Sequence, residues 1–140
     1  MDGWAAGSKS SEVSALMDST DPDLSAFRFR GGKLIILENM ADYAQSPFAG
    51  IRYVDSVVER MGAGQVAEFL RLYTAGNVDM LSALADWVER GKPPAGLQLV
   101  AQETKPPFAV TRSRPLCEWP RWPQYKGGDL NRAESFECAR

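Results

Sequence analysis

Two short aliphatic runs, each followed by a segment with helical periodicity, constrain the fold of this chain more than any other feature. The first run is residues 34–37 (LIIL), which follows Gly31-Gly32 and Lys33, and the second lies within residues 66–73 and ends in FLRLY. Short, continuous apolar runs of this kind predict buried strands of a parallel sheet. The order strand, helix, strand, helix predicts two neighbouring parallel strands with right-handed crossovers, which places the chain in the α/β class.

Both intervening segments carry apolar residues on one helical face. Ser46-Pro47 predicts the start of the first helix, and Gly62 and Gly64 are expected to end it. Arg90-Gly91 predicts the end of the second helix. The residues expected to face the sheet are Ile51, Val54, Val58 and Met61 in the first helix, and Met80, Leu81, Leu84, Trp87 and Val88 in the second.

The two ends of the chain differ from this middle part. Residues 1–20 are rich in Ser, Gly and Asp and predict a flexible arm, which leaves residues 21–140 as the folded region. Residues 97–102 and 108–111 predict short edge strands on either side of Pro106-Pro107, and an irregular tail is expected from Ser113 onward. In that tail, Trp119, Trp122 and Tyr125 either stack on a sugar or phenolic ring or pack over the sheet, which is the commoner role of such residues.

Composition excludes several function classes. A net charge of −2 with no basic stripe argues against a nucleic-acid partner. No run of 18 apolar residues predicts a membrane span, and the first residues lack the pattern of a signal peptide. Cys117 and Cys138 are compatible with one disulfide or with two unrelated thiols, and their spacing fits no zinc pattern. No metal or other cofactor is therefore expected.

Four stretches carry a more specific signal. They are residues 23–27 with 30–35; Ala41-Asp42 with Ser46-Pro47; residues 84–94 (LADWVERGKPP); and residues 112–117 (RSRPLC) with 125–127, Ser135-Phe136 and Cys138. In this order and spacing, over residues 20 to 140, they resemble the C-terminal part of the tannase and feruloyl esterase family of α/β-hydrolases. The resemblance implies a partial α/β-hydrolase fold with a tail closed by a Cys117–Cys138 disulfide.

The resemblance also implies a role for Asp42. In this family the strand before the first helix ends in His-Gly-x-x-Asp, whose Asp is the acid of a Ser-Asp-His triad, and Asp42 occupies that position. Here Glu38 and Asn39 replace His-Gly, and Tyr43 stands where proline is usual. The loop that would carry the triad His looks deleted after Tyr73, the chain contains no histidine, and the Ser nucleophile of the family belongs to a part N-terminal to this region.

These departures leave two functional hypotheses. In the first, the chain is a truncated or degenerate member of a carboxylic ester hydrolase lineage acting on phenolic esters, a pseudoenzyme or fragment that is inactive alone because Asp42 has no base to orient. In the second, it is a non-catalytic module whose exposed sheet edge and aromatic tail dock a complementary N-terminal esterase half or another copy of itself.

Two further interpretations of the acidic residues stay open. Asp42 is compatible with a solvated loop carboxylate. Glu38 and Asp42 are also expected to lie in one loop after the end of the first strand, where they could form a carboxylate pair for acid/base work, which is a weak signal. The location of the protein is also open, because relatives are typically exported to the periplasm or the medium whereas this sequence shows no signal peptide.

Overall fold

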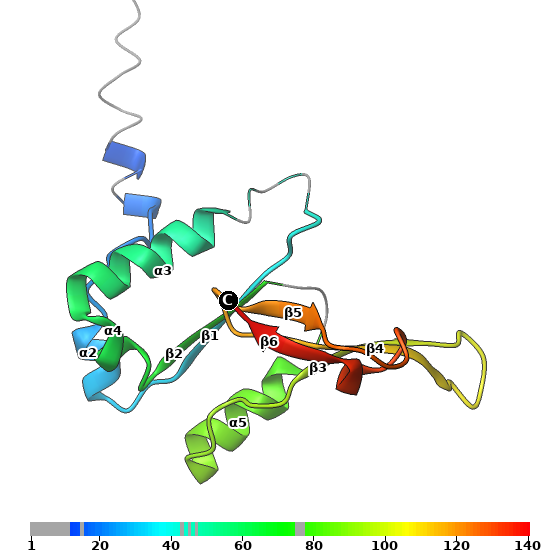
Figure 1. Cartoon of the computed structure of the whole chain (residues 1–140). Coiled ribbons are helices and arrows are strands. Elements are labelled where there is room, and N and C mark those ends of the chain that lie inside the picture. Colours follow the sequence, from blue (N-terminus) through cyan, green and yellow to red (C-terminus); the bar gives the residue numbers. More distant parts are fainter. Residues whose placement is uncertain (1–11, 15, 43, 45, 47, 75–77) are drawn as a thin grey trace, which may run out of the picture.

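A computed structural model describes residues 12–14, 16–42, 44, 46, 48–74 and 78–140 (Figure 1). Its helices are α2 (Ser25–Phe29), α3 (Phe48–Met61), α4 (Ala63–Val66) and α5 (Met80–Arg90), with a 3-10 turn η1 (Ala133–Ser135). Its strands are β1 (Leu34–Glu38), β2 (Leu70–Thr74), β3 (Gln98–Gln102), β4 (Val110–Pro115), β5 (Trp122–Tyr125) and β6 (Phe136–Ala139). In the described part these strands form three two-stranded sheets: β1–β2, β3–β4 and β5–β6.

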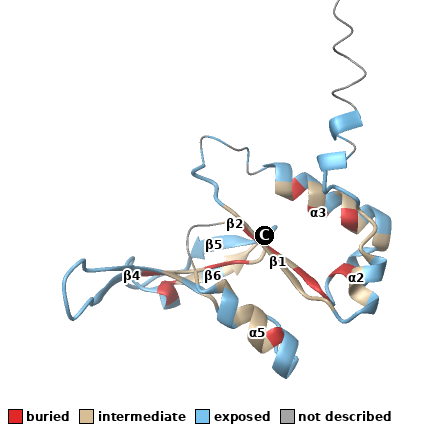
Figure 2. Cartoon of the chain, turned by 180° about the vertical axis from the view of Figure 1, so that it is seen from behind, coloured by how far each residue is buried: buried red, intermediate tan, exposed pale blue. Residues whose placement is uncertain are grey.

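The predicted parallel pair is confirmed. β1 and β2 run in parallel with Leu34 opposite Leu70 and Glu38 opposite Thr74, so that their carboxyl ends meet at one edge. The helix α3 joins them, and α3 and α5 lie on opposite sides of this sheet in both views (Figures 1 and 2). The α/β class expected from the order of apolar segments is therefore the observed one.

The core lies between α3, α4 and one face of β2. Its buried members are Ile51, Val54, Val57, Val66, Phe69, Leu70 and Leu72. Val58 and Met61, which the helical spacing placed on the buried face, only border this cluster, while Val57 is fully buried. The buried face of α3 is thus centred on Val57 rather than on Val58. The helix α4, which the sequence pattern did not predict, contributes Val66 to the same core.

The opposite layer is thinner than expected. Of the predicted buried face of α5 only Trp87 is buried, at 3% exposure, whereas Leu81 and Val88 are 79% and 59% exposed. All five residues of β1 are half-buried although a buried strand was predicted. Both corrections have one cause: within the described residues β1 pairs only with β2, and a two-stranded sheet covers a narrow strip of a helix.

Two of the three glycines that were predicted to end helices do so. Gly62 has a φ of 85° and follows α3, and Gly91 adopts the left-handed conformation that ends α5. Gly64 was expected to act with Gly62 but lies inside α4. Pro47, the predicted first residue of α3, and residues 75–77 of the predicted turn after β2 lie outside the described residues.

The C-terminal third is more regular than predicted. β3 and β4 pair with each other in antiparallel fashion as a separate sheet, so they are not edge strands of the parallel sheet. The tail from Ser113 was expected to be irregular, yet β5 and β6 form a second antiparallel pair within it. Backbone pairing between segments this far apart leaves no local apolar periodicity, which is why the sequence did not predict it.

The tail also reaches the parallel sheet. Glu118 forms an antiparallel bridge with Tyr73, and the Trp119 amide donates to the Leu72 carbonyl at 2.8 Å. One edge of β2 is thereby covered by the chain itself. The predicted arm lies largely outside the described residues, with residues 12–14 and 16–17 helical and exposed, so the boundary at residue 20 stays a prediction.

Candidate functional site

The carboxyl edge of the β1–β2 sheet is where open α/β folds place their sites. Asp42 follows β1 at this edge and is exposed. Its amide donates to the Asn39 carbonyl at 3.1 Å, and its Oδ1 accepts from the Ala44 amide at 2.8 Å. These contacts fix the carboxylate within a local turn. Asp42 therefore has the position that its sequence context predicts, and its catalytic role stays a prediction.

Glu38 is placed differently from the expectation. It is the last residue of β1 rather than a loop residue. Its carboxylate lies against Gly50 in the first turn of α3, where even one methyl group on Gly50 would overlap it. Glu38 therefore packs against the helix that follows it, and the paired-carboxylate interpretation loses the shared loop on which it rested.

The connection from β2 to α5 also starts at the carboxyl edge of the β1–β2 sheet. β2 ends at Thr74 and α5 begins at Met80, with Asp79 as its N-cap. The Asp79 Oδ1 accepts from the Ser82 amide at 3.0 Å, and this hydrogen bond lowers the pKa of the Asp79 carboxyl. Only residues 75–79 lie between strand and helix, and none of them is a histidine.

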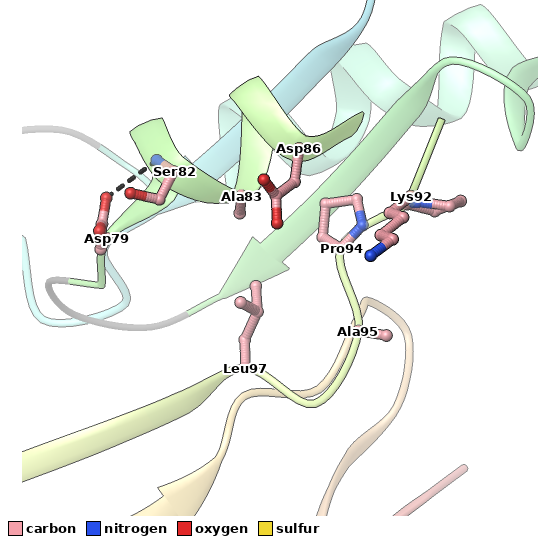
Figure 3. Close-up of a pocket in the computed structure, with 9 residues that line it drawn as sticks. Asp79, Ser82, Ala83, Asp86, Lys92, Pro94, Ala95 and Leu97 are labelled. Carbon is pink, nitrogen blue, oxygen red and sulfur yellow. Dashed lines mark hydrogen bonds between the residues drawn. The ribbon is translucent and has the colours of Figure 1, made fainter. Parts of the chain in front are cut away.

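A pocket of about 500 Å³ lies beside α5, between this helix and residues 92–97 (Figure 3). Its polar and charged lining residues are Asp79, Ser82, Asp86 and Lys92. Asp79 caps the helix and Asp86 is paired with Arg90, so both carboxylates already have structural partners. Ser82 has no histidine that could act as its base in a chain without one. The pocket therefore offers no serine–histidine pair for ester hydrolysis.

The C-terminal cysteines are joined. Cys117 and Cys138 form a disulfide with a Cα–Cα distance of 5.6 Å, which confirms the bond that the resemblance implied. It ties the segment after β4 to β6. The aromatic side chains nearby do not shield the sheet as expected: Trp119, Trp122 and Tyr125 are 37%, 53% and 48% exposed. The backbone of Glu118 and Trp119 covers the sheet edge instead.

A polar cluster on the second face of β2 was missed by the sequence analysis. The Arg71 guanidinium lies 4.8 Å from the centre of the buried Trp87 ring, and its Nε is 3.5 Å from Glu118 Oε1. The Tyr73 hydroxyl donates to the Pro94 carbonyl at 3.4 Å, and burial, then the Glu118 charge, raises the pKa of Tyr73. The signal was the lone cation in an otherwise apolar run at residues 69–73.

Comparison with known proteins decides the family. The family model described as tannase and feruloyl esterase matches residues 4–139. The chain belongs to the tannase and feruloyl esterase family. An uncharacterized esterase of Agrobacterium fabrum is 39% identical over 140 residues, covering 91% of this chain and 25% of that protein. A mono(2-hydroxyethyl) terephthalate hydrolase of Piscinibacter sakaiensis is 38% identical over 138 residues, covering 86% and 22%.

Solved structures of this family share the fold. Feruloyl esterase B from Aspergillus oryzae superposes with a TM-score of 0.78 at 21% identity, covering 94% of this chain and 32% of that one. Tannin acyl hydrolase from Aspergillus niger superposes with a TM-score of 0.67 at 28% identity, covering 86% and 25%. The chain thus spans about a quarter of the length of the curated relatives it matches.

None of the helices described is long and apolar enough to cross a membrane. Across the same residues, no three side chains among His, Cys, Asp and Glu gather where they could hold a metal ion.

Proposed function

We propose that this chain is the C-terminal portion of an α/β-hydrolase fold from the phenolic-ester branch of its family, and that it does not hydrolyse esters by itself. One observation carries the proposal: the 140 residues contain no histidine, and five residues separate Thr74 from Met80 where the family's histidine loop would lie. A serine nucleophile needs a neighbouring base to accept its proton.

In this proposal Asp42 keeps the place of the triad acid without its function. A triad acid orients the histidine and stabilises its charged form, so it contributes nothing where the histidine is missing. The position of Asp42 supports this assignment, because the residue follows β1 at the edge where Glu38 and Thr74 lie side by side. The turn around Asn39 and Ala44 holds the carboxylate without help from a histidine.

The test is a hydrolysis assay on the purified chain with methyl ferulate and a gallate ester. We expect no release of acid above the buffer rate, and no change on Asp42→Ala. Asp55→Ala, which removes an exposed carboxylate from α3, is the matched control. Turnover that disappears in Asp42→Ala and persists in Asp55→Ala would show that Asp42 is catalytic and would refute the proposal.

A second function is favoured by the outer edge of β1. No described strand pairs with that edge, and the whole strand is half-exposed. An open strand edge of aliphatic residues is a template for pairing with another chain. In this alternative the chain docks a complementary esterase half or a second copy of itself.

Light scattering after size-exclusion chromatography tests the alternative. We expect a mass above 15.4 kDa that falls on dilution, or a complex with the part of a family member that precedes the matching region. Ile35→Lys should abolish either association, while Val100→Lys, on the exposed face of β3, should leave it unchanged. A monomer at every concentration that also fails to bind the esterase half would refute it.

A further inference from the structure

Two arginines, Arg71 and Arg121, lie beside the Glu118 carboxylate where the tail meets the parallel sheet. Glu118 Oε1 lies 3.5 Å from Arg71 Nε, and Glu118 Oε2 lies 3.7 Å from the Arg121 guanidinium. No ion pair is formed by Arg114 among the residues that the structure describes. A neighbouring cavity is lined by Arg114 and Arg121 and, in the described part of the chain, by no carboxylate, although the chain as a whole has a net charge of −2.

Two of these arginines line one cavity. Arg114 and Arg121 form its charged wall, and Leu99, Trp122 and Pro123 form much of its apolar wall. The cavity measures about 320 Å³, which is at the small end of the range for small-molecule sites. It has room for a single ring with short substituents rather than for a peptide or an oligosaccharide.

The cavity is partly preorganised. The Arg114 guanidinium lies 4.1 Å from the centre of the Phe136 ring and donates to the Ser113 carbonyl at 2.8 Å. Stacking and this hydrogen bond hold one edge of the guanidinium and leave its other donors available. Trp122 is 53% exposed, so one large aromatic surface stands beside the charged wall without a covering group.

We propose that this cavity binds a small aromatic carboxylate. The carboxylate would lie against Arg114 and Arg121, because guanidinium groups bind carboxylates through paired, charge-assisted hydrogen bonds. The ring would lie against Trp122 and Pro123, where apolar contact favours an aromatic over an inorganic anion. This binding involves no covalent reaction, and it does not depend on whether the chain hydrolyses esters.

Titration with sodium 4-hydroxybenzoate, followed by the indole N–H signals of the ¹⁵N-labelled chain, tests the proposal. The Trp122 signal is assigned as the one that Trp122→Phe removes. We expect this signal to shift saturably, and the dissociation constant to rise about tenfold in Arg121→Gln, since a hydrogen bond to a charged group is lost. Arg112→Gln, which removes an exposed cation from the same strand as Arg114 without touching the cavity, should leave the constant unchanged.

The choice of ligands separates the proposal from simple anion binding. Methyl 4-hydroxybenzoate keeps the ring and loses the charge. Its dissociation constant, measured from the Trp122 signal, should be at least tenfold higher. Phosphate or sulfate binding as tightly as 4-hydroxybenzoate would overturn the aromatic specificity. An unmoved Trp122 signal at millimolar ligand, or an equal effect of Arg121→Gln and Arg112→Gln, would overturn the site. Arg121 is half-exposed, so its substitution does not put folding at risk.

Discussion

The two parts of the molecule are stabilised by different means. Residues 24–74 contain the whole apolar core cluster, from Ile51 to Leu72, with α3 packed on a parallel sheet. The part from β3 to β6 buries Leu116, Cys117, Ala133, Ser113 and Ser135, and its exposed strands are held by backbone pairing and one disulfide. Figure 2 shows this contrast, with exposed residues dominating the β3–β4 arm.

This difference indicates which part can fold alone. Burial of apolar surface is the main favourable contribution to folding, and the first part has such a core. The second part has little apolar surface to bury, so its order depends on a covalent link and on its contacts with β2. The chain spans about a quarter of the length of the esterase relative from Agrobacterium fabrum.

The largest effect is expected in the core of the first part. Phe69 is 1% exposed and its ring lies 6.1 Å from that of Phe27. Phe69→Ala should lower the free energy of unfolding by about 3–5 kcal/mol, because it removes a buried ring and leaves a cavity. Urea unfolding measures this change. Phe48→Ala, at a phenylalanine 53% exposed, is the control and should cost less than about 0.5 kcal/mol. Similar losses in both variants would contradict a core centred on Phe69.

The second effect concerns the covalent link. Replacing Cys117 and Cys138 together by alanine should lower the free energy of unfolding by roughly 3 kcal/mol, since the open chain gains conformational freedom. Hydrogen exchange locates the loss: amides of β5 and β6 should lose protection while those of β1 and β2 keep it. Equal loss in all four strands would show that the two parts unfold as one unit.

The sequence predicted the first part better than the second, for a physical reason. The run LIIL at residues 34–37 and the spacing of Ile51 and Val54 are local patterns, and they were enough to predict β1, α3 and the parallel pairing with β2. The pairing of Trp122 with Ala139 joins residues far apart in a segment rich in proline and glycine, and no local pattern indicates it. The disulfide was predicted from the family resemblance, together with the cysteine spacing and the need to hold an irregular segment in place.

The candidate site shows the same limit. Asp42 could be located because a strand and a family motif precede it. The cavity around Arg114 and Arg121 could not, because these residues come together only after β4 and β5 have been placed. Leu81 and Val88 were predicted to be buried because the pattern gives the face of a helix but not the width of the sheet that covers it.

The third effect tests the contact between the two parts, which we call the seam: Arg71 and Tyr73 of β2 against Glu118 of the tail. Arg71 belongs to the first part and contacts Trp87 of α5 and Glu118 of the second part. Arg71→Met keeps the aliphatic stem and removes the charge, so we expect a loss of about 1 kcal/mol from the cation–aromatic contact. Thermal unfolding measures it. Lys33→Met, whose ammonium lies 5.4 Å from the same ring, is the comparison. A larger loss there than in Arg71→Met would mean that Arg71 does not link the parts.

The smallest effect appears only at high pH and involves two tyrosines. Tyr73 lies where the two parts meet, and Tyr53 packs against the apolar core. Burial raises the pKa of Tyr73 and of Tyr53 above the ordinary value of 10.0. A tyrosine whose pKa is higher in the folded state stabilises the fold fully below pH 10.0, and this contribution is lost as the pH rises through the raised folded value. The free energy of unfolding should therefore fall above pH 10, and less steeply in Tyr73→Phe.

The neutral-pH baseline of that variant is part of the same test. Tyr73→Phe removes a long hydrogen bond to the Pro94 carbonyl, so below pH 10 it should cost less than about 1 kcal/mol. Tyr53→Phe, which removes the hydrogen bond from this tyrosine of the first part to the Asp21 carbonyl, is its counterpart. If the seam is the weaker region, alkaline pH should first expose the amides of β2 and of residues 116–119, and Tyr73→Phe should delay this exposure while Tyr53→Phe does not. The reverse order would place the alkaline weak point in the core, because deprotonation of Tyr53 would then open the fold before deprotonation of Tyr73 releases the tail.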